Sequence, residues 1–114
     1  MAAPDTGAPA RATVAERDGR VEVGGRLDFT TAREVLGRVA GTIERAPSTT
    51  VDLAGVTGAN SAGLALLIEW LGVARRAGHE VRFAHVPEGL RQLARVCQVD
   101  ALLASASEPG PTPA

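Results

Sequence analysis

The stretch VDLAGVTGANSAGLALLIEWL, from Val51 to Leu71, constrains the fold of this chain more than any other part. The apolar and β-branched residues from Thr49 to Leu53 predict a strand. A glycine-containing turn is predicted over Gly55–Gly58, and an apolar helix is predicted from Ala62 to Ala77. We therefore expect the rest of the chain to support this unit of strand, turn and helix.

Ser61 stands directly before the predicted helix. Serine is a preferred N-cap residue, so we expect its hydroxyl first to cap the helix and second to contact a partner. A phosphate at this position would gain from the free N–H groups and the dipole of the helix N-terminus. It would also add about −1.5 to −2 charges at a surface turn, which would block docking on an apolar surface. The position is therefore chemically suited to a switch.

The predicted helix after Ser61 is apolar over an unusually wide arc. At about 100° per residue, two apolar faces adjoin, whereas a helix packed on one sheet face shows a single arc a little over about 100° wide. Two interpretations remain open: neighbouring helices cover the second face, or that face contacts a partner protein. The first face holds Leu64, Leu67, Ile68 and Leu71, and the second holds Leu66, Trp70, Val73 and Ala77.

The flanking segments predict a small α/β domain with a mixed sheet of about four strands and about four helices. Asp18-Gly19 between two alternating runs predicts a β-hairpin, after which Gly24 to Asp28 is expected to leave the sheet. A helix-length crossover before Thr49 predicts that the next strand is parallel to an earlier one. Further elements are predicted as a helix capped by Thr30 or Thr31 that runs to about Arg45, a strand at Glu80–Ala84, a helix from Glu88 to about Val96, and a short helical turn at 100–103.

The 114 residues are enough for one domain, which we place at residues 12–104. Residues 1–11 and 105–114 are rich in Ala, Pro and Gly and are predicted to be disordered tails. The start shows no secretory signal, and the most apolar stretch, Ala62–Ala74, is shorter than the roughly 20 residues of a membrane span. We therefore expect a cytoplasmic protein that does not itself insert into a membrane.

Composition excludes several classes of function. The net charge is −1, aromatic residues make up 3% and Tyr is absent, so neither a basic field nor a stacking platform for nucleic acid is expected. All 12 basic residues are Arg, and a chain without Lys cannot form a Walker A loop or a Schiff base.

No catalytic or metal-binding constellation is evident. His79 and His85 are isolated, without a carboxylate or Cys at metal-ligand spacing, and are expected to be strand-end residues. Asp28 and Asp52 are expected to serve as a turn or strand-edge charge. The single cysteine, Cys97, fits a reducing compartment and is predicted to be core-facing and inert. We accordingly expect no enzyme activity, cofactor or metal.

The segment VDLAGVTGANSAGLALL resembles the signature of STAS domains, the fold of anti-sigma factor antagonists. That signature joins an apolar strand, an Asp-Ser or Asp-Thr pair and an apolar helix, and the resemblance covers roughly residues 13–104. It implies that Ser61 is the phosphorylatable or contact hydroxyl. Asn60 departs from the pattern, since the usual residue is Asp, and this departure weakens recognition by a kinase more than it weakens partner binding.

Within STAS proteins, GLALLIEWL and GRLDFTTA are most similar to the MlaB-type subunit of the ABC complex that moves phospholipids between Gram-negative membranes. This resemblance implies a regulatory subunit that binds the ATPase subunit of that complex. The alternative is an anti-sigma factor antagonist that binds an anti-sigma factor or serine kinase and is controlled by phosphorylation of Ser61. Either partner is expected to contact Ser61 together with Asn60, Ala62, Leu64, Leu66, Leu67 and Trp70.

Overall fold

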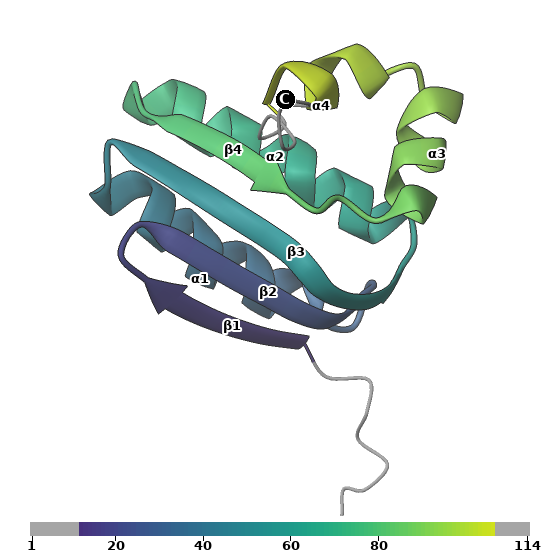
Figure 1. The fold of residues 1–114 in the computed structure, drawn as a ribbon, viewed down its shortest axis with the longest axis horizontal. Coiled ribbons are helices and arrows are strands. Elements are labelled where there is room, and N and C mark those ends of the chain that lie inside the picture. Colours follow the sequence, from purple (N-terminus) through teal and green to yellow (C-terminus); the bar gives the residue numbers. More distant parts are fainter. Residues whose placement is uncertain (1–11, 107–114) are drawn as a thin grey trace, which may run out of the picture.

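The computed structural model describes residues 12–106 and confirms a mixed α/β fold with a four-stranded sheet and four helices (Figure 1). The predicted N-terminal tail and residues 107–114 lie outside the described residues. The elements in chain order are β1 (Ala12–Arg17), β2 (Arg20–Leu27), α1 (Ala32–Arg45), β3 (Ser48–Ala59), α2 (Ser61–Ala77), β4 (Glu80–Ala84), α3 (Glu88–Val96) and α4 (Asp100–Ala106).

The sheet has the order β1-β2-β3-β4. The predicted hairpin joins β1 and β2 as antiparallel neighbours, with positive φ at both Asp18 (50°) and Gly19 (79°), as a type I′ turn requires. The predicted crossover is also present, because α1 returns the chain so that β3 pairs with β2 in parallel. After α2, β4 adds to the other edge of β3, again in parallel.

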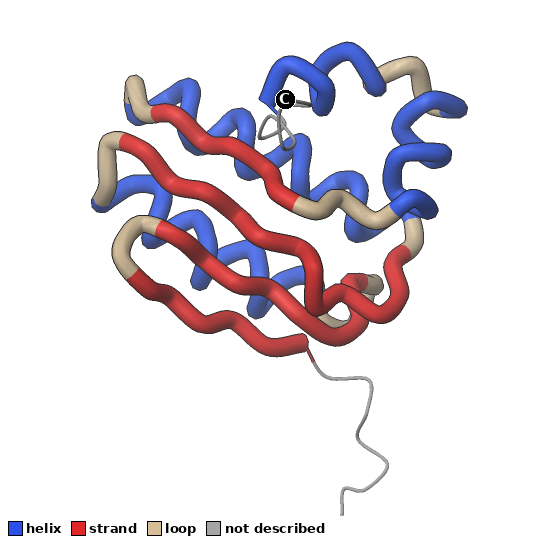
Figure 2. Tube along the Cα trace, in the orientation of Figure 1, coloured by secondary structure: helices blue, strands red, loops and turns tan. Residues whose placement is uncertain are grey.

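Both long helices lie behind one face of the sheet, and the opposite face of the described strands carries no helix (Figure 2). Side chains along the strands accordingly alternate between buried and exposed positions. Val21 and Val51 are fully buried toward the helices, whereas Glu22 on the open face is exposed and Asp52 there is partly exposed. This alternation is typical of a sheet with one dry and one wet face.

The predicted turn at Gly55–Gly58 is wrong, and so is the prediction that Gly24–Asp28 leaves the sheet. β3 continues to Ala59 and β2 to Leu27, and their extensions pair in parallel through two register shifts. The glycines permit this pairing rather than a turn: a Cβ on Gly24 would lie 3.2 Å from the Gly55 carbonyl oxygen and 3.0 Å from Thr13 Oγ1. Glycine within a strand marks such close approach as readily as it marks a turn.

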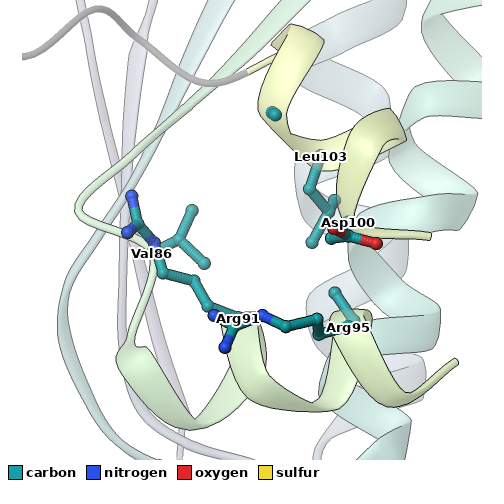
Figure 3. A pocket seen from close by; sticks show the side chains of 7 residues that line it. Val86, Arg91, Arg95, Asp100 and Leu103 are labelled. Carbon is teal, nitrogen blue, oxygen red and sulfur yellow. The ribbon is translucent and has the colours of Figure 1, made fainter. Parts of the chain in front are cut away.

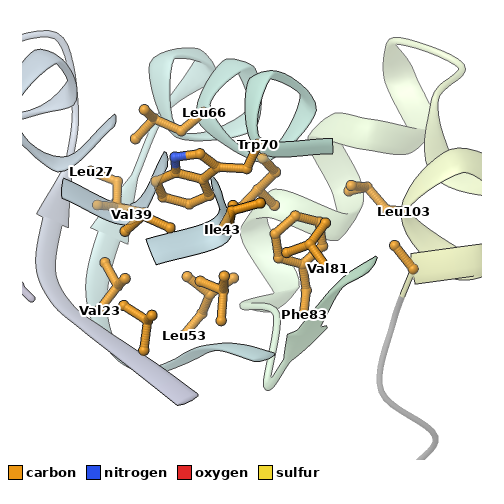
Figure 4. Packing of buried hydrophobic residues seen from close by; sticks show 14 of the residues in the cluster. Val23, Leu27, Val39, Ile43, Leu53, Leu66, Trp70, Val81, Phe83 and Leu103 are labelled. Atoms are coloured by element: carbon orange, nitrogen blue, oxygen red, sulfur yellow. The ribbon is translucent and has the colours of Figure 1, made fainter. Parts of the chain in front are cut away.

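The second apolar face of α2 is buried against neighbouring elements, with α1 contributing, except at its last residue, Ala77, which is exposed. This favours the alternative in which neighbouring helices cover the face. Trp70 is fully buried among residues of both helices and the sheet (Figure 4). Its indole N–H donates a 3.2 Å hydrogen bond to the Leu36 carbonyl of α1. Leu66 and Val73, on the same face, are buried as well. The helix is apolar over a wide arc because it packs simultaneously on the sheet and on α1.

Cys97 is exposed, so its predicted core-facing position is wrong. The apolar periodicity of α3 does bury Leu90 and Ala94. The helix ends at Val96, however, and the backbone turns through positive φ at Gln98 (62°) before α4 begins. Cys97 is the residue after the last helical turn and no longer follows the buried face.

Candidate functional site

Ser61 lies at the end of the sheet where the C-terminal ends of β2 and β3 meet. The strands remain paired to their last residues, Leu27 and Ala59, and the Asn60 N–H then donates a 3.2 Å hydrogen bond to the Leu27 carbonyl. The chain enters α2 immediately afterwards, at Ser61. The start of α2 is therefore tied to the end of β2.

Asn60, rather than Ser61, caps α2, which corrects the prediction that Ser61 is the cap. The Asn60 side-chain oxygen accepts a 2.9 Å hydrogen bond from the Ala62 N–H. Its backbone carbonyl accepts from the Gly63 and Leu64 N–H groups. An aspartate oxygen could accept the same bond as the Asn60 amide oxygen, so the departure from the usual Asp leaves the capping geometry intact.

Because Asn60 takes the capping role, the Ser61 side chain is left available. Ser61 is exposed, and within residues 12–106 its hydroxyl has no hydrogen-bond partner. It is the first residue of α2, where the helix dipole favours negative charge. A phosphate on this oxygen would be stabilised by the helix N-terminus and would add negative charge to the surface there.

The other predicted contact residues lie mainly inside the protein. Asn60 is half-buried, whereas Ala62, Leu64, Leu66, Leu67 and Trp70 are buried. In this structure their side chains hold α2 against the sheet and α1, and so determine where Ser61 sits. The exposed residues on the same part of α2 are Ala65, Ile68 and Glu69.

A surface groove that the sequence does not indicate lies next to Ser61, between α1 and α2. The groove has a volume of about 420 Å³ and is formed mainly by apolar side chains. Arg33 of α1 and Glu69 of α2 also line it. We call it the Phe29 groove, and its apolar wall consists of Phe29, Ala32 and Leu36 on one side and Ala62, Ala65 and Leu66 on the other.

The loop that carries Phe29 is held in place by Asp28. The Asp28 carboxylate accepts hydrogen bonds from the Thr30 N–H (2.9 Å), the Thr30 hydroxyl (2.6 Å) and the Thr31 N–H (3.3 Å). These bonds, first of all the one from the Thr30 hydroxyl, hold the pKa of Asp28 below its ordinary value. The expectation that Asp28 is a turn charge is confirmed.

The Phe29 groove could not be predicted from the sequence, because Phe29 is a single apolar residue in a polar loop.

A second cluster, on the open face of the sheet, joins β2, β3 and the residue that follows β4, and no local sequence signal indicates it. Asp52 Oδ1 lies 2.9 Å from His85 Nδ1, and Asp52 Oδ2 accepts a 3.0 Å bond from Arg20 Nη2. Partial burial alone would raise the pKa of Asp52. Hydrogen bonds from the Ala54 N–H, His85 and Arg20 outweigh burial and hold that pKa below its ordinary value. The sequence separation of 33 between Asp52 and His85 conceals this contact in the sequence.

We expect Asp52→Asn to lower the free energy of unfolding near neutral pH by about 1 kcal/mol, because its partners lose a charged acceptor. The pKa of Asp52 is lower in the folded chain than its ordinary value of 3.8, so the ionised form stabilises the fold above that pH. This stabilisation is lost as the pH falls through the folded-state pKa. Urea denaturation at neutral pH and below about pH 3 measures the difference, which should shrink in acid.

Glu22→Gln is the matched control, since Glu22 lies on the same face and has no ion pair within the described residues. A difference between Asp52→Asn and the unmodified chain that persists unchanged in acid would contradict the role assigned to the carboxylate.

The remaining histidine and a smaller cavity lie away from Ser61. His79 Nδ1 lies 2.9 Å from the Ile43 carbonyl near the C-terminal end of α1, as expected of a strand-end residue. A cavity of about 230 Å³ lies between α3, α4 and the segment after β4 (Figure 3). Its lining combines Val86 and Leu103 with the charged residues Arg91, Arg95 and Asp100.

Gly63 allows α2 to approach the sheet closely at the site. A Cβ on Gly63 would lie 3.1 Å from the Ala59 Cβ and 3.3 Å from both the Leu27 Cβ and the Leu27 carbonyl oxygen. We expect Gly63→Val to lower the free energy of unfolding by about 1–3 kcal/mol, because these neighbours cannot move aside as a flexible side chain would. Chemical denaturation measures the effect. Gly37→Val is the control, because nothing lies within 4 Å of its Cβ position; equal stability of the two variants would contradict this account.

No group of three or more His, Cys, Asp and Glu side chains in residues 12–106 could hold a metal ion. No helix in the same range is long and apolar enough to cross a membrane.

The sequence pattern over this fold matches a known family model. The model described as the MlaB-type STAS domain covers residues 11–104. The chain belongs to the STAS domain family. A comparison with curated proteins found no match.

Solved structures agree on the fold of this STAS domain. An anti-sigma factor antagonist from Mycobacterium paratuberculosis superposes with a TM-score of 0.67 at 20% identity, covering 86% of this chain and 84% of that one. The Bacillus cell fate determinant SpoIIAA in its phosphorylated form gives 0.62 at 12% identity, with 85% and 88% covered. The anti-sigma factor antagonist SpoIIAA in its unphosphorylated form gives 0.58 at 10% identity, with 74% and 81% covered. At these identities the likeness establishes the fold alone.

Proposed function

We propose that this STAS domain is a non-catalytic cytoplasmic regulatory subunit that docks on a partner protein through the end of the molecule carrying Ser61. The partner proposed is the ATPase subunit of an MlaB-type ABC complex for phospholipid transport. One observation carries the proposal: Asn60 caps α2 and so leaves the Ser61 hydroxyl exposed and without a partner within the described residues.

Two further features support this assignment. The family model that matches the chain is the MlaB type, and it spans nearly all of the described residues. The Phe29 groove adjoins the start of α2 and offers an apolar surface for a partner. In this proposal the buried residues of α2 between Leu64 and Trp70 do not touch the partner. They fix the position of α2, and therefore the position of Ser61 relative to the groove.

The test is reconstitution with purified proteins from the same organism. Mixed with the ATPase subunit of its phospholipid ABC transporter, the chain is expected to form a complex that survives size-exclusion chromatography. A chain that elutes alone at micromolar concentrations would contradict the assignment. Co-purification from native cells is the second readout, and an eluate without ATPase subunit or permease would count against it.

The exposed Ser61 hydroxyl also favours a second candidate, an anti-sigma factor antagonist switched by phosphorylation. A phosphate at the N-terminus of α2 is compatible with the fold and would alter the charge of the docking surface. Incubation with the organism's anti-sigma factor kinases and ATP, followed by intact-mass spectrometry, tests this candidate. Modification of Ser61 together with a stable complex before modification would support it, and an unmodified chain that forms no complex would oppose it.

A further inference from the structure

We infer that the Phe29 groove receives an amphipathic helix of the partner protein, with an acidic side chain of that helix facing Arg33. This inference rests on the proposed docking function, because the groove and Ser61 belong to the same end of the molecule. It goes further by naming the anchor residue on this chain, the secondary structure of the occupant and the charge that the occupant carries.

Phe29 is an anchor presented to solvent. The chain has three aromatic residues, of which Trp70 and Phe83 are buried, whereas Phe29 is 75% exposed. The loop around it is fixed by the bonds of Asp28 to Thr30 and Thr31. An aromatic side chain on an ordered loop loses little conformational entropy on binding, and such residues frequently dominate the energy of an interface.

The occupant is a helix because the groove offers an extended segment few backbone partners. Leu36, Ala65, Leu66 and Glu69 lie within α1 and α2, where backbone groups pair internally. In the first turns, the Ala32 N–H donates to the Asp28 carbonyl and the Ala62 N–H donates to the Asn60 side chain. An extended segment would leave its own N–H and C=O groups facing apolar side chains, which is costly. An α-helix satisfies its backbone internally and can place an apolar face in the groove. The small side chains Ala32 and Ala65 leave room for larger apolar groups of the partner.

The charges around the groove favour an acidic residue on the partner. Glu69 is already paired with Arg76 of the same helix, at 3.4 Å. Arg33 is exposed and has no ion pair within residues 12–106. Of the two charged residues that line the groove, Arg33 is therefore the one left to pair with a partner, and an acidic side chain of the docked helix would be complementary to it on the α1 side.

Ser61 is placed to regulate the same groove. It stands four residues before Ala65 on α2, so both residues lie on one face of the helix, one turn apart. A phosphate on Ser61 would add negative charge beside a surface that binds an acidic helix. Phosphorylation would then weaken docking by repulsion as well as by desolvation.

Site-specific photo-cross-linking in native cells tests the occupant, whichever protein it belongs to. With p-benzoylphenylalanine in place of Phe29, mass spectrometry is expected to locate the cross-link on a helical segment that has apolar residues on one face and an Asp or Glu beside them. A cross-link to a second copy of this chain, to a membrane lipid or to a basic segment would overturn the inference. The same probe in place of Val96 serves as the reference for non-specific cross-linking. A probe at Phe29 that gives no cross-link beyond this reference would also overturn the inference.

Affinity measurements with the purified ATPase subunit complete the test. Phe29→Ala is expected to weaken binding at least tenfold, whereas the control Val96→Ala, at another exposed apolar side chain (80% exposed), should leave it unchanged. Arg33→Glu should weaken binding by a similar factor, Arg33→Lys should retain most of it, and the control Arg75→Glu should be neutral. If Ser61→Asp weakens binding but both groove variants bind normally, the inference fails while the proposed function stands. If the ATPase subunit does not bind at all, the proposed function fails, and the cross-linked segment alone decides the inference.

Discussion

Replacing Trp70 with alanine is expected to lower the free energy of unfolding by about 3–5 kcal/mol. The side chain is fully buried between α1, α2 and the sheet, so truncation leaves a cavity lined by residues of all three. The indole N–H bond to the Leu36 carbonyl is lost as well. Urea or thermal denaturation monitored by circular dichroism measures the change.

Trp70→Phe separates the two contributions, because it keeps most of the buried surface and removes the N–H donor. We expect it to cost about 1–2 kcal/mol, well below the alanine variant. If Trp70→Ala instead left stability nearly unchanged and reduced partner binding, Trp70 would be an interface residue and the packing of α2 against α1 described here would be incorrect.

Ser61→Asp is expected to weaken binding to the ATPase subunit at least tenfold, which corresponds to about 1.4 kcal/mol. The introduced carboxylate must be desolvated when an apolar surface docks beside it. Loss of folding cannot explain such a result, since a negative charge at the first turn of α2 adds about 0.3–1 kcal/mol of stability. Isothermal titration calorimetry measures the affinity, and denaturation of the same sample measures the stability.

Ser48→Asp is the matched control for this variant. Ser48 is also exposed, and it begins β3, at the opposite end of that strand from Ser61. The same added charge there should leave the affinity unchanged. An unaltered dissociation constant for Ser61→Asp would refute docking at this surface, and an equal loss for both variants would show that the effect comes from net charge rather than from position.

Much of the fold follows from local sequence signals. The Asp18-Gly19 hairpin, the helix ended by Gly78 and the alternation in β4 can each be predicted from a few neighbouring residues. The errors arise where a distant segment determines the structure. Gly55 and Gly58 suggest a turn because the pairing of their strand with Gly24–Leu27 cannot be seen locally.

The candidate site is predictable in position but not in detail. The sequence directs attention to Asn60 and Ser61, and the structure assigns the cap to Asn60 because its side chain reaches the Ala62 N–H. From the sequence alone, the second apolar face of α2 could equally contact a partner protein. In the structure that face packs in one core with residues of α1, a helix separated from α2 in the chain by β3. The groove beside Phe29 depends on two helices meeting and has no signature in either one.

The most direct test of the central claim is a residue-resolved map of the surface that the partner covers. The ¹⁵N-labelled chain is titrated with the unlabelled ATPase subunit, and amide signals are followed by transverse-relaxation-optimised NMR. The account predicts that perturbations concentrate at Phe29, at Ser61 and along the exposed face of α2 near Ala65. Perturbations confined to the open face of the sheet around Asp52, or to the cavity between α3 and α4, would contradict it.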